Sequence, residues 1–292
     1  MNSNVSTQDL YPAHLQFPQQ LVDERLSSSH GRIDLALLAA ERVEAQITPQ
    51  TRLIVQTDPH GLAADRFRSL RLGLRTLAAS SNLKVLLVTS SLPREGKSTT
   101  ALNLAASLAS HGKDSVALVE VDFRHPSLAE YLGLSPGPGL VRALEDGTDP
   151  LTAMRIVDPL GFYFLPAGEP AANPFDLLNS DQFARTLQRL RASVDWVILD
   201  APPANPVPDL LAVTSKVDGC LWVLRAGSTP REAMEDGIRQ VGANLIVGMV
   251  LNEAEGGEHS YAQYRGYGNG LSEASSNTPK IHAPDRAPDR LD

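Results

Sequence analysis

The sequence contains a single cysteine, few aromatic residues and no long apolar run. An intrachain disulfide is therefore excluded, and Cys220, which lies within the apolar stretch 219–224, is expected to be a buried thiol. Aromatic residues make up 5% of the 292 residues, whereas 42% are hydrophobic. A chain of this length can bury one sizeable core, and that core must be mostly aliphatic.

The sequence also lacks an excess of positive charge and any obvious membrane or export signal. Its formal net charge of -8 disfavours nucleic acid as the main partner. A spanning helix would need about 20 consecutive apolar residues, and no such run is present. The N-terminus is polar and has no apolar signal segment, so we expect a cytoplasmic protein.

Changes in composition divide the chain into three regions. Residues 1–50 form a leader that begins with polar residues and Pro, followed by a short helical pattern from Ile33 to Val43. Residues 51–252 carry the regular alternation of a folded domain. Residues 253–292 are rich in Gly, Ser, Glu, Asn and Pro, which is typical of a flexible tail.

The central region alternates between apolar strands and amphipathic helices. We expect helices at 62–79, 98–110, 180–191 and 230–241, and strands at 84–89, 115–121, 162–165, 196–199, 219–224 and 245–251. Near-continuous apolar strands separated by helices indicate an α/β fold with a mostly parallel sheet that is covered on both faces.

A glycine-rich phosphate loop is indicated directly after the first strand of this domain. Residues 91–98 read S-L-P-R-E-G-K-S, which fits the Walker A pattern except that Ser91 replaces the first glycine. Backbone amides at the start of the following helix would face the phosphates, and Gly96 lets the chain curl closely around them. Lys97 would reach the β- and γ-phosphates, and the Ser98 hydroxyl would bind Mg²⁺. The strand before the loop and the helix after it favour this function over a simple helix cap.

Carboxylates follow two other predicted strands. Glu120 and Asp122 end one strand and Asp200 ends another, at the edge of the sheet where ligands of such folds collect. A carboxylate in this position is typical of a Walker B metal site. The alternatives are a helix cap for Asp200 and a solvated charge at the strand end for Glu120.

Taken together, these motifs resemble the bacterial tyrosine kinases, the cytoplasmic autokinases of capsule and exopolysaccharide assembly. The resemblance implies a MinD-like P-loop fold that binds ATP with Mg²⁺. It places Asp122 and Asp200 at the metal, and Glu120 where the family has an aspartate that helps to bring up the acceptor hydroxyl. It also implies nucleotide contacts for Ser91, Pro93, Glu95, Gly96, Lys97, Ser98, Thr99 and, at the base, Asn252.

The resemblance extends to assembly and to the phosphate acceptor. Asp65, Arg68 and Arg71 resemble the family's oligomerisation motif, which implies a homo-oligomer such as a ring. Tyr261, Tyr264 and Tyr267 form a short cluster like the family's C-terminal acceptor tyrosines. The implied partners are a membrane-spanning polysaccharide chain-length protein, which would hold the chain at the inner face of the membrane, and a phosphotyrosine phosphatase.

Two other functions remain open from the sequence. A ParA- or MinD-type ATPase would position cargo, but such proteins carry an extra lysine where this chain has Leu92. A nucleotide-sensing regulator of polysaccharide export would bind ATP without efficient tyrosine phosphorylation. The presence or absence of phosphotyrosine on the tail separates the kinase from both.

Overall fold

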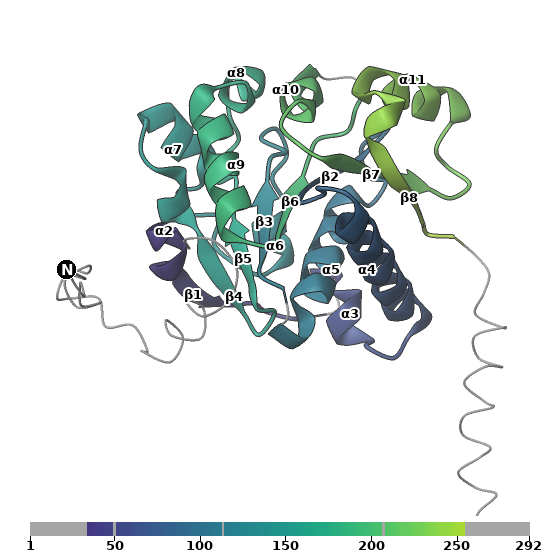
Figure 1. Cartoon of the computed structure of the whole chain (residues 1–292), viewed down its shortest axis with the longest axis horizontal. Coiled ribbons are helices and arrows are strands. Elements are labelled where there is room, and N and C mark those ends of the chain that lie inside the picture. Colours follow the sequence, from purple (N-terminus) through teal and green to yellow (C-terminus); the bar gives the residue numbers. More distant parts are fainter. Residues whose placement is uncertain (1–33, 49–50, 113, 206–207, 255–292) are drawn as a thin grey trace, which may run out of the picture. The chain divides into compact units, whose positions relative to one another are not determined.

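The computed structural model describes residues 34–48, 51–112, 114–205 and 208–254 (Figure 1). Internal contacts divide the chain into two units, Met1–Ala254 and Glu255–Asp292, and all of the described residues belong to the first. The predicted acceptor tyrosines Tyr261, Tyr264 and Tyr267 lie outside the described residues. Within the described part, no helix is long and apolar enough to cross a membrane.

The described residues form an eight-stranded sheet in the order β1-β4-β5-β3-β6-β2-β7-β8. Neighbouring strands are parallel except for β4 and β5. The strands are β1 (Glu41–Glu44), β2 (Val85–Ser90), β3 (Val116–Glu120), β4 (Arg155–Asp158), β5 (Phe162–Leu165), β6 (Trp196–Asp200), β7 (Gly219–Arg225) and β8 (Ile246–Asn252).

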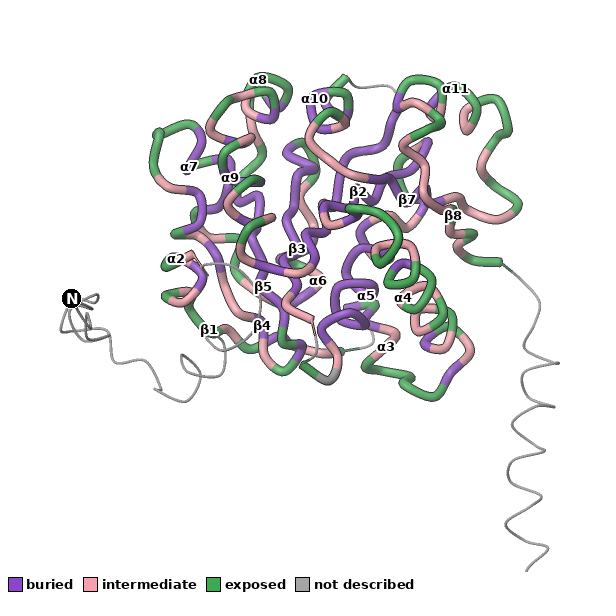
Figure 2. The backbone as a smooth tube through the Cα atoms, in the orientation of Figure 1, coloured by how far each residue is buried: buried purple, intermediate pink, exposed green. Residues whose placement is uncertain are grey.

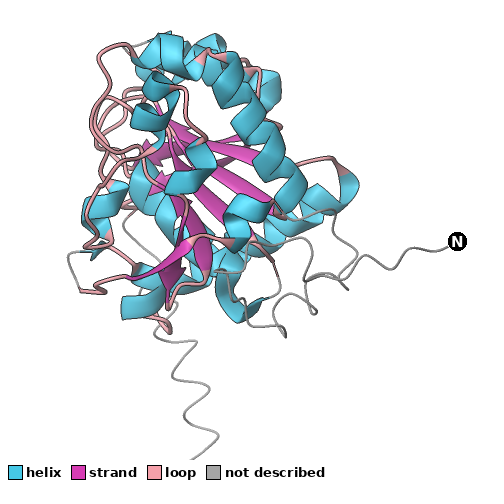
Figure 3. Cartoon of the chain, turned by 90° about the vertical axis from the view of Figure 1, so that its left-hand side faces the viewer, coloured by secondary structure: helices cyan, strands magenta, loops and turns pink. Residues whose placement is uncertain are grey.

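Helices cover both faces of this sheet (Figure 3). They are α2 (Leu35–Leu38), α3 (Ile54–Thr57), α4 (Leu62–Ser80), α5 (Lys97–Ala109), α6 (Leu128–Tyr131), α7 (Leu140–Asp146), α8 (Pro174–Leu178), α9 (Asp181–Ser193), α10 (Leu211–Thr214) and α11 (Arg231–Val241). The long α9 begins where the Ser180 hydroxyl accepts a hydrogen bond from the Phe183 amide, which is a typical N-cap.

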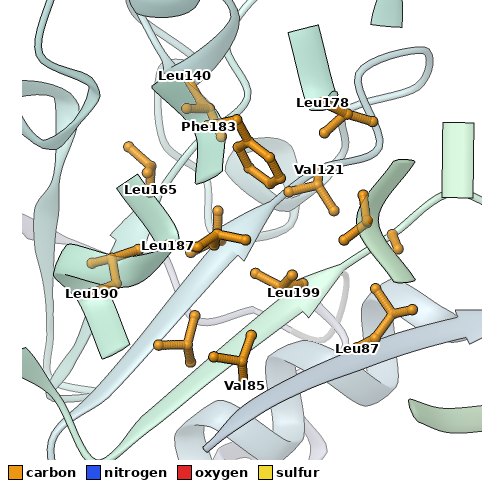
Figure 4. Close-up of a cluster of buried hydrophobic side chains, with 14 of the residues drawn as sticks. Val85, Leu87, Val121, Leu140, Leu165, Leu178, Phe183, Leu187, Leu190 and Leu199 are labelled. Carbon is orange, nitrogen blue, oxygen red and sulfur yellow. The ribbon is translucent and has the colours of Figure 1, made fainter. Parts of the chain in front are cut away.

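The alternation of side chains along the strands produces two hydrophobic cores. Val85 and Leu87 of β2 pack into the core that contains Leu187 of α9 (Figure 4), whereas Leu86 and Val88 pack against α5 on the opposite face. The central strands are accordingly buried along their length (Figure 2). The predicted α/β fold with a mostly parallel, doubly covered sheet is confirmed, and Cys220 is buried as expected.

The prediction of a helix over residues 33–43 was wrong. Among the described residues of this range, only Leu35–Leu38 are helical, and Glu41–Glu44 form strand β1, which pairs in parallel with β4 at the edge of the sheet. The apolar residues there suggested one helical face, but Leu37 packs in one core and Val43 packs against the other. The described part of the expected leader thus contributes to the sheet.

Candidate nucleotide and metal site

The predicted phosphate loop connects the buried strand β2 to helix α5. The helix begins at Lys97, directly after Gly96, whose φ of 97° lies in the left-handed region. A Cβ atom at Gly96 would lie 2.1 Å from the Asn252 amide nitrogen. The backbone conformation at this position therefore favours glycine, and a side chain here would also displace the Asn252 amide.

Ser91, which replaces the first glycine of the motif, is fully buried. Its hydroxyl oxygen accepts a hydrogen bond of 3.2 Å from the Trp222 indole nitrogen. The residues with positive φ in the described chain do not include Ser91, so glycine's conformational freedom is not needed there. The substitution therefore provides a partner for a buried indole N–H that a glycine would leave without one.

The Glu95 side chain supports the loop from behind. One carboxylate oxygen accepts a hydrogen bond of 2.8 Å from the Leu92 amide, and the other accepts from the Thr229 hydroxyl. The Asn252 side chain donates to the Glu95 carbonyl at 3.1 Å. Glu95 and Asn252 were both predicted to contact the nucleotide. Their side chains instead form hydrogen bonds within the protein, and these bonds fix the shape of the loop.

The loop forms one wall of a cleft of about 640 Å³. The residues of the predicted site that line it are Pro93, Gly96, Lys97, Ser98, Thr99 and Asp122. Sequence analysis missed the other residues, namely Arg52, Arg94, His125, Ser127, Tyr131, Pro203, Arg225 and Glu253. Arg94 and His125 lie within the motifs and could have been identified, whereas Arg52 and Tyr131 are brought to the cleft only by tertiary folding.

Lys97 and Asp122 form a buried ion pair in this cleft. The Lys97 ammonium lies 2.8 Å from one Asp122 oxygen, and the other oxygen accepts a hydrogen bond from the His125 amide at 3.1 Å. Burial acts to lower the pKa of Lys97, but the charges of Asp200 and Asp122 outweigh it and the pKa is raised. Lys97 therefore remains a cation at the cleft.

Asp200 is buried at the end of β6 with both carboxylate oxygens lacking a hydrogen-bond partner among the described residues. Burial raises its pKa to about 7, although the nearby Lys97 charge and the Ser98 hydroxyl act in the opposite direction. A buried carboxylate is costly unless cations and hydrogen bonds offset its charge. The donor set of Asp200 and the Ser98 hydroxyl consists of the hard oxygen ligands that Mg²⁺ prefers, so the residues fit a magnesium site.

Glu120 is buried, which excludes the solvated charge considered above. One carboxylate oxygen accepts hydrogen bonds from the amides of Ser127 and Leu128, at 2.6 and 2.7 Å, and the other accepts from the Ala167 amide at 3.1 Å. Burial raises the pKa of Glu120, and these three hydrogen bonds oppose the rise. Glu120 does not line the cleft, and its carboxylate instead holds the start of α6.

The three residues of the expected oligomerisation motif also lie away from the cleft. Arg68 forms an ion pair with Asp65 and donates to the Pro59 carbonyl, all within the same part of the chain. Arg71 donates to the Ser107 carbonyl at 2.8 Å and to the Ser110 hydroxyl at 2.6 Å, so it joins α4 to the end of α5. Both arginines therefore have partners within the chain.

The fold and the loop define a P-loop nucleotide-binding protein. No protein-family model matches the chain. Tyrosine-protein kinase YwqD of Bacillus subtilis is 28% identical over 219 residues, which cover 74% of this chain and 92% of YwqD. Among solved structures, the VpsO kinase domain is 29% identical with a TM-score of 0.56, and the match covers 67% of this chain and all of that domain.

A further relative is the succinoglycan biosynthesis transport protein ExoP of Rhizobium meliloti. It is 30% identical over 210 residues, which cover 70% of this chain but only 26% of ExoP. The chain thus spans nearly the whole of YwqD and about a quarter of ExoP. In its site and in these similarities, the chain resembles the bacterial tyrosine kinases.

Proposed function

We propose that this chain is an ATP-dependent protein tyrosine kinase that phosphorylates its own C-terminal tail and regulates exopolysaccharide or capsule assembly. The observation that carries the proposal is the buried Asp200 carboxylate, which lies near the Lys97 ammonium, together with the Lys97–Asp122 pair in the P-loop cleft. This arrangement has positive charge for phosphates and an oxygen ligand for a cation, and the chain is similar to known tyrosine kinases.

Each residue of the cleft has a separate role in this proposal. The amides of the loop and the Lys97 ammonium bind the phosphates, while Ser98, Asp122 and Asp200 hold Mg²⁺, which supplies neutralising charge when bound. In the reaction, the phenolic oxygen of the acceptor forms a bond to the γ-phosphorus as the bond to the β,γ-bridging oxygen breaks. ADP leaves, and the phenolic proton passes to solvent.

The acceptors in this proposal are Tyr261, Tyr264 and Tyr267. A second copy of the chain supplies or receives the tail, and a membrane-spanning polysaccharide chain-length protein docks on the kinase and activates it at the inner face of the membrane. A phosphotyrosine phosphatase reverses the modification. The match to ExoP, a polysaccharide transport protein, supports this biological setting.

Mass spectrometry of the intact tail tests the proposal. Protein incubated with ATP and Mg²⁺ should gain phosphate on at least one of the three tail tyrosines, and Lys97→Met should abolish the gain. Nucleotide binding without any phosphotyrosine, with and without the cytoplasmic tail of a candidate partner, would favour the regulator instead. Hydrolysis of ATP without phosphotyrosine would favour the cargo-positioning ATPase.

A further inference from the structure

Arg52 lies in the P-loop cleft although it precedes the first motif by about forty residues. Its side chain is exposed and lines the cleft together with Lys97 and Asp122. Arg52 is not part of the phosphate loop or of either carboxylate motif. It lies in the segment directly before α3, and α3 contacts α5.

The main chain of Arg52 is held in an unusual conformation by the phosphate-loop helix. Its φ of 53° is in the left-handed region, which is costly for a residue with a side chain unless the surroundings impose it. The Asn103 side chain, fully buried on α5, donates to the Arg52 carbonyl at 2.7 Å and accepts from the Val55 amide at 3.1 Å. Asn103 also donates to the Thr99 carbonyl at 2.8 Å, so one amide group connects Arg52 to the first turn after the loop.

The guanidinium of Arg52 is placed over an aromatic ring at the same cleft. Its central carbon lies 5.8 Å from the centroid of the Tyr131 ring, within the range of a cation–π contact. Tyr131 ends α6, the helix whose start is held by Glu120. Tyr131 therefore orients the Arg52 side chain, and Asn103 fixes the Arg52 main chain.

Charge pairing distinguishes Arg52 and Arg94 from Lys97 and Arg225, and of the first two only Arg52 has its carbonyl bound by Asn103. Lys97 is paired with Asp122 at 2.8 Å, and Arg225 is paired with Glu253 at 2.5 Å. No carboxylate forms a salt bridge with Arg52 in the part of the chain that the structure describes. Its positive charge is consequently available to an anion that enters the cleft.

We propose that Arg52 is a catalytic residue that contacts the terminal phosphoryl group of the nucleotide during transfer, and that Asn103 is the residue that positions it. The inference rests on the proposed function, because it assumes that a phosphoryl group is transferred in this cleft. In the transition state, negative charge is spread over the equatorial oxygens of that group, where a planar guanidinium binds well. Arg52 supplies this charge from the same chain.

Steady-state kinetics with a peptide that copies residues 258–268 provide the first test. Arg52→Ala should lower kcat by about 100-fold or more, because arginines in this role contribute large factors. Arg52→Lys should recover about a tenth of the wild-type rate, since it keeps the charge and loses the planar fork. Arg142→Ala, which removes an exposed arginine from α7, should leave kcat unchanged.

Binding measurements separate catalysis from simple nucleotide affinity. The affinity for MgADP should stay within about twofold of the wild type in Arg52→Ala, because ADP lacks the group that Arg52 contacts. Tight binding of ADP with aluminium fluoride, a mimic of the phosphoryl group in transfer, should be lost. The proposal would be overturned if Arg52→Ala bound MgADP as the wild type does and also bound ADP with aluminium fluoride as tightly as the wild type.

A double-mutant cycle tests the positioning role of Asn103. Asn103→Ala alone should lower kcat, whereas in the Arg52→Ala background it should have little further effect on kcat. Its effect on the free energy of unfolding should be the same in both backgrounds, which separates positioning from stability. Equal kcat losses in the two backgrounds would overturn the role of Asn103.

The outcomes distinguish this inference from the function on which it rests. A wild-type protein that produces no phosphotyrosine would refute the kinase function itself. A wild-type kinase with an undiminished Arg52→Ala variant would refute only the role of Arg52. If Arg94→Ala lowered kcat as much as Arg52→Ala does, the general positive charge of the cleft would account for both losses. That result would also overturn the proposal.

Discussion

Asp200 has two buried oxygens without a hydrogen-bond partner in the described structure, so its protonation depends on its burial and on the nearby Lys97 charge. Burial raises its pKa to about 7 from an ordinary value of 3.8. The folded protein therefore retains a proton that the unfolded chain loses between these two pH values. The free energy of unfolding that the protonated Asp200 contributes is fully present below pH 3.8. It is lost as the pH rises through about 7, because the buried side chain then becomes charged.

Asp200→Asn should remove this pH dependence. Without magnesium, the variant should be more stable than the wild type above pH 7, by about 2–4 kcal/mol, because it no longer buries a carboxylate charge. The difference should shrink towards pH 4. Urea unfolding in the presence of a chelator at pH 5 and pH 8 measures this, with Asp176→Asn at an exposed position as the control. A difference in stability that does not change with pH would contradict the account.

Ser91→Gly restores the glycine of the Walker A pattern and should nevertheless be harmful. It removes the acceptor of the Trp222 indole N–H in a fully buried site, and an unsatisfied buried donor costs about 1–3 kcal/mol. We expect a lower free energy of unfolding and a changed tryptophan fluorescence spectrum. A Ser91→Gly variant as stable as the wild type would show that this hydrogen bond contributes little.

At the scale of elements, Glu120 joins three segments of the chain. The end of β3, the start of α6 and the residue Ala167 after β5 meet at its carboxylate. Since α6 carries Tyr131 and begins next to Ser127, both at the cleft, this carboxylate helps to form one wall of the site. Sequence reasoning could place Glu120 at the strand end, but not identify the distant amides to which it would bind.

Glu120→Asp tests whether this residue acts on the acceptor or on α6. Aspartate is the family's residue, but its shorter side chain cannot keep all three hydrogen bonds. We expect a loss of about 1–3 kcal/mol in the free energy of unfolding and a lower kcat, with Glu130→Asp at an exposed position of α6 as the control. A higher kcat in Glu120→Asp would instead support the acceptor role that the family resemblance implies.

For the whole molecule, the sequence was sufficient to predict the parallel sheet. The central strands are continuous apolar runs, and the long helices show apolar residues at helical spacing, so the two kinds of element are easily told apart. It missed β4, whose four residues include a charge at each end, and β1, whose residues are mostly exposed. Such edge elements are defined by pairing with strands that are distant in sequence. The loop and Asp200 were predictable from motifs, whereas Arg52 was not, because its place depends on Asn103.

The proposed assembly makes a prediction at this scale for Arg68 and Arg71. Arg68→Glu should dissociate the oligomer and change the free energy of unfolding by less than about 1 kcal/mol, since its ion pair is about 40% exposed. Arg71→Glu should destabilise each subunit as well, because it removes the contacts with the end of α5. Light scattering and urea unfolding measure the two effects.

Arg66→Glu is the matched control for these variants. It makes the same change of charge at an exposed position on the same helix, so we expect it to retain both assembly and stability. An oligomer that survives Arg68→Glu and Arg71→Glu would exclude these arginines from the interface. Their contacts within the chain would then account for their presence.

Calorimetric titration with MgATP tests the central claim, that the loop around Gly96 and the Lys97 cation bind a polyphosphate. The account predicts saturable binding at one site per chain in the wild type, weaker binding without magnesium, and none that is measurable in Lys97→Met. A wild-type protein with no measurable affinity for ATP or ADP in the presence of magnesium would contradict it.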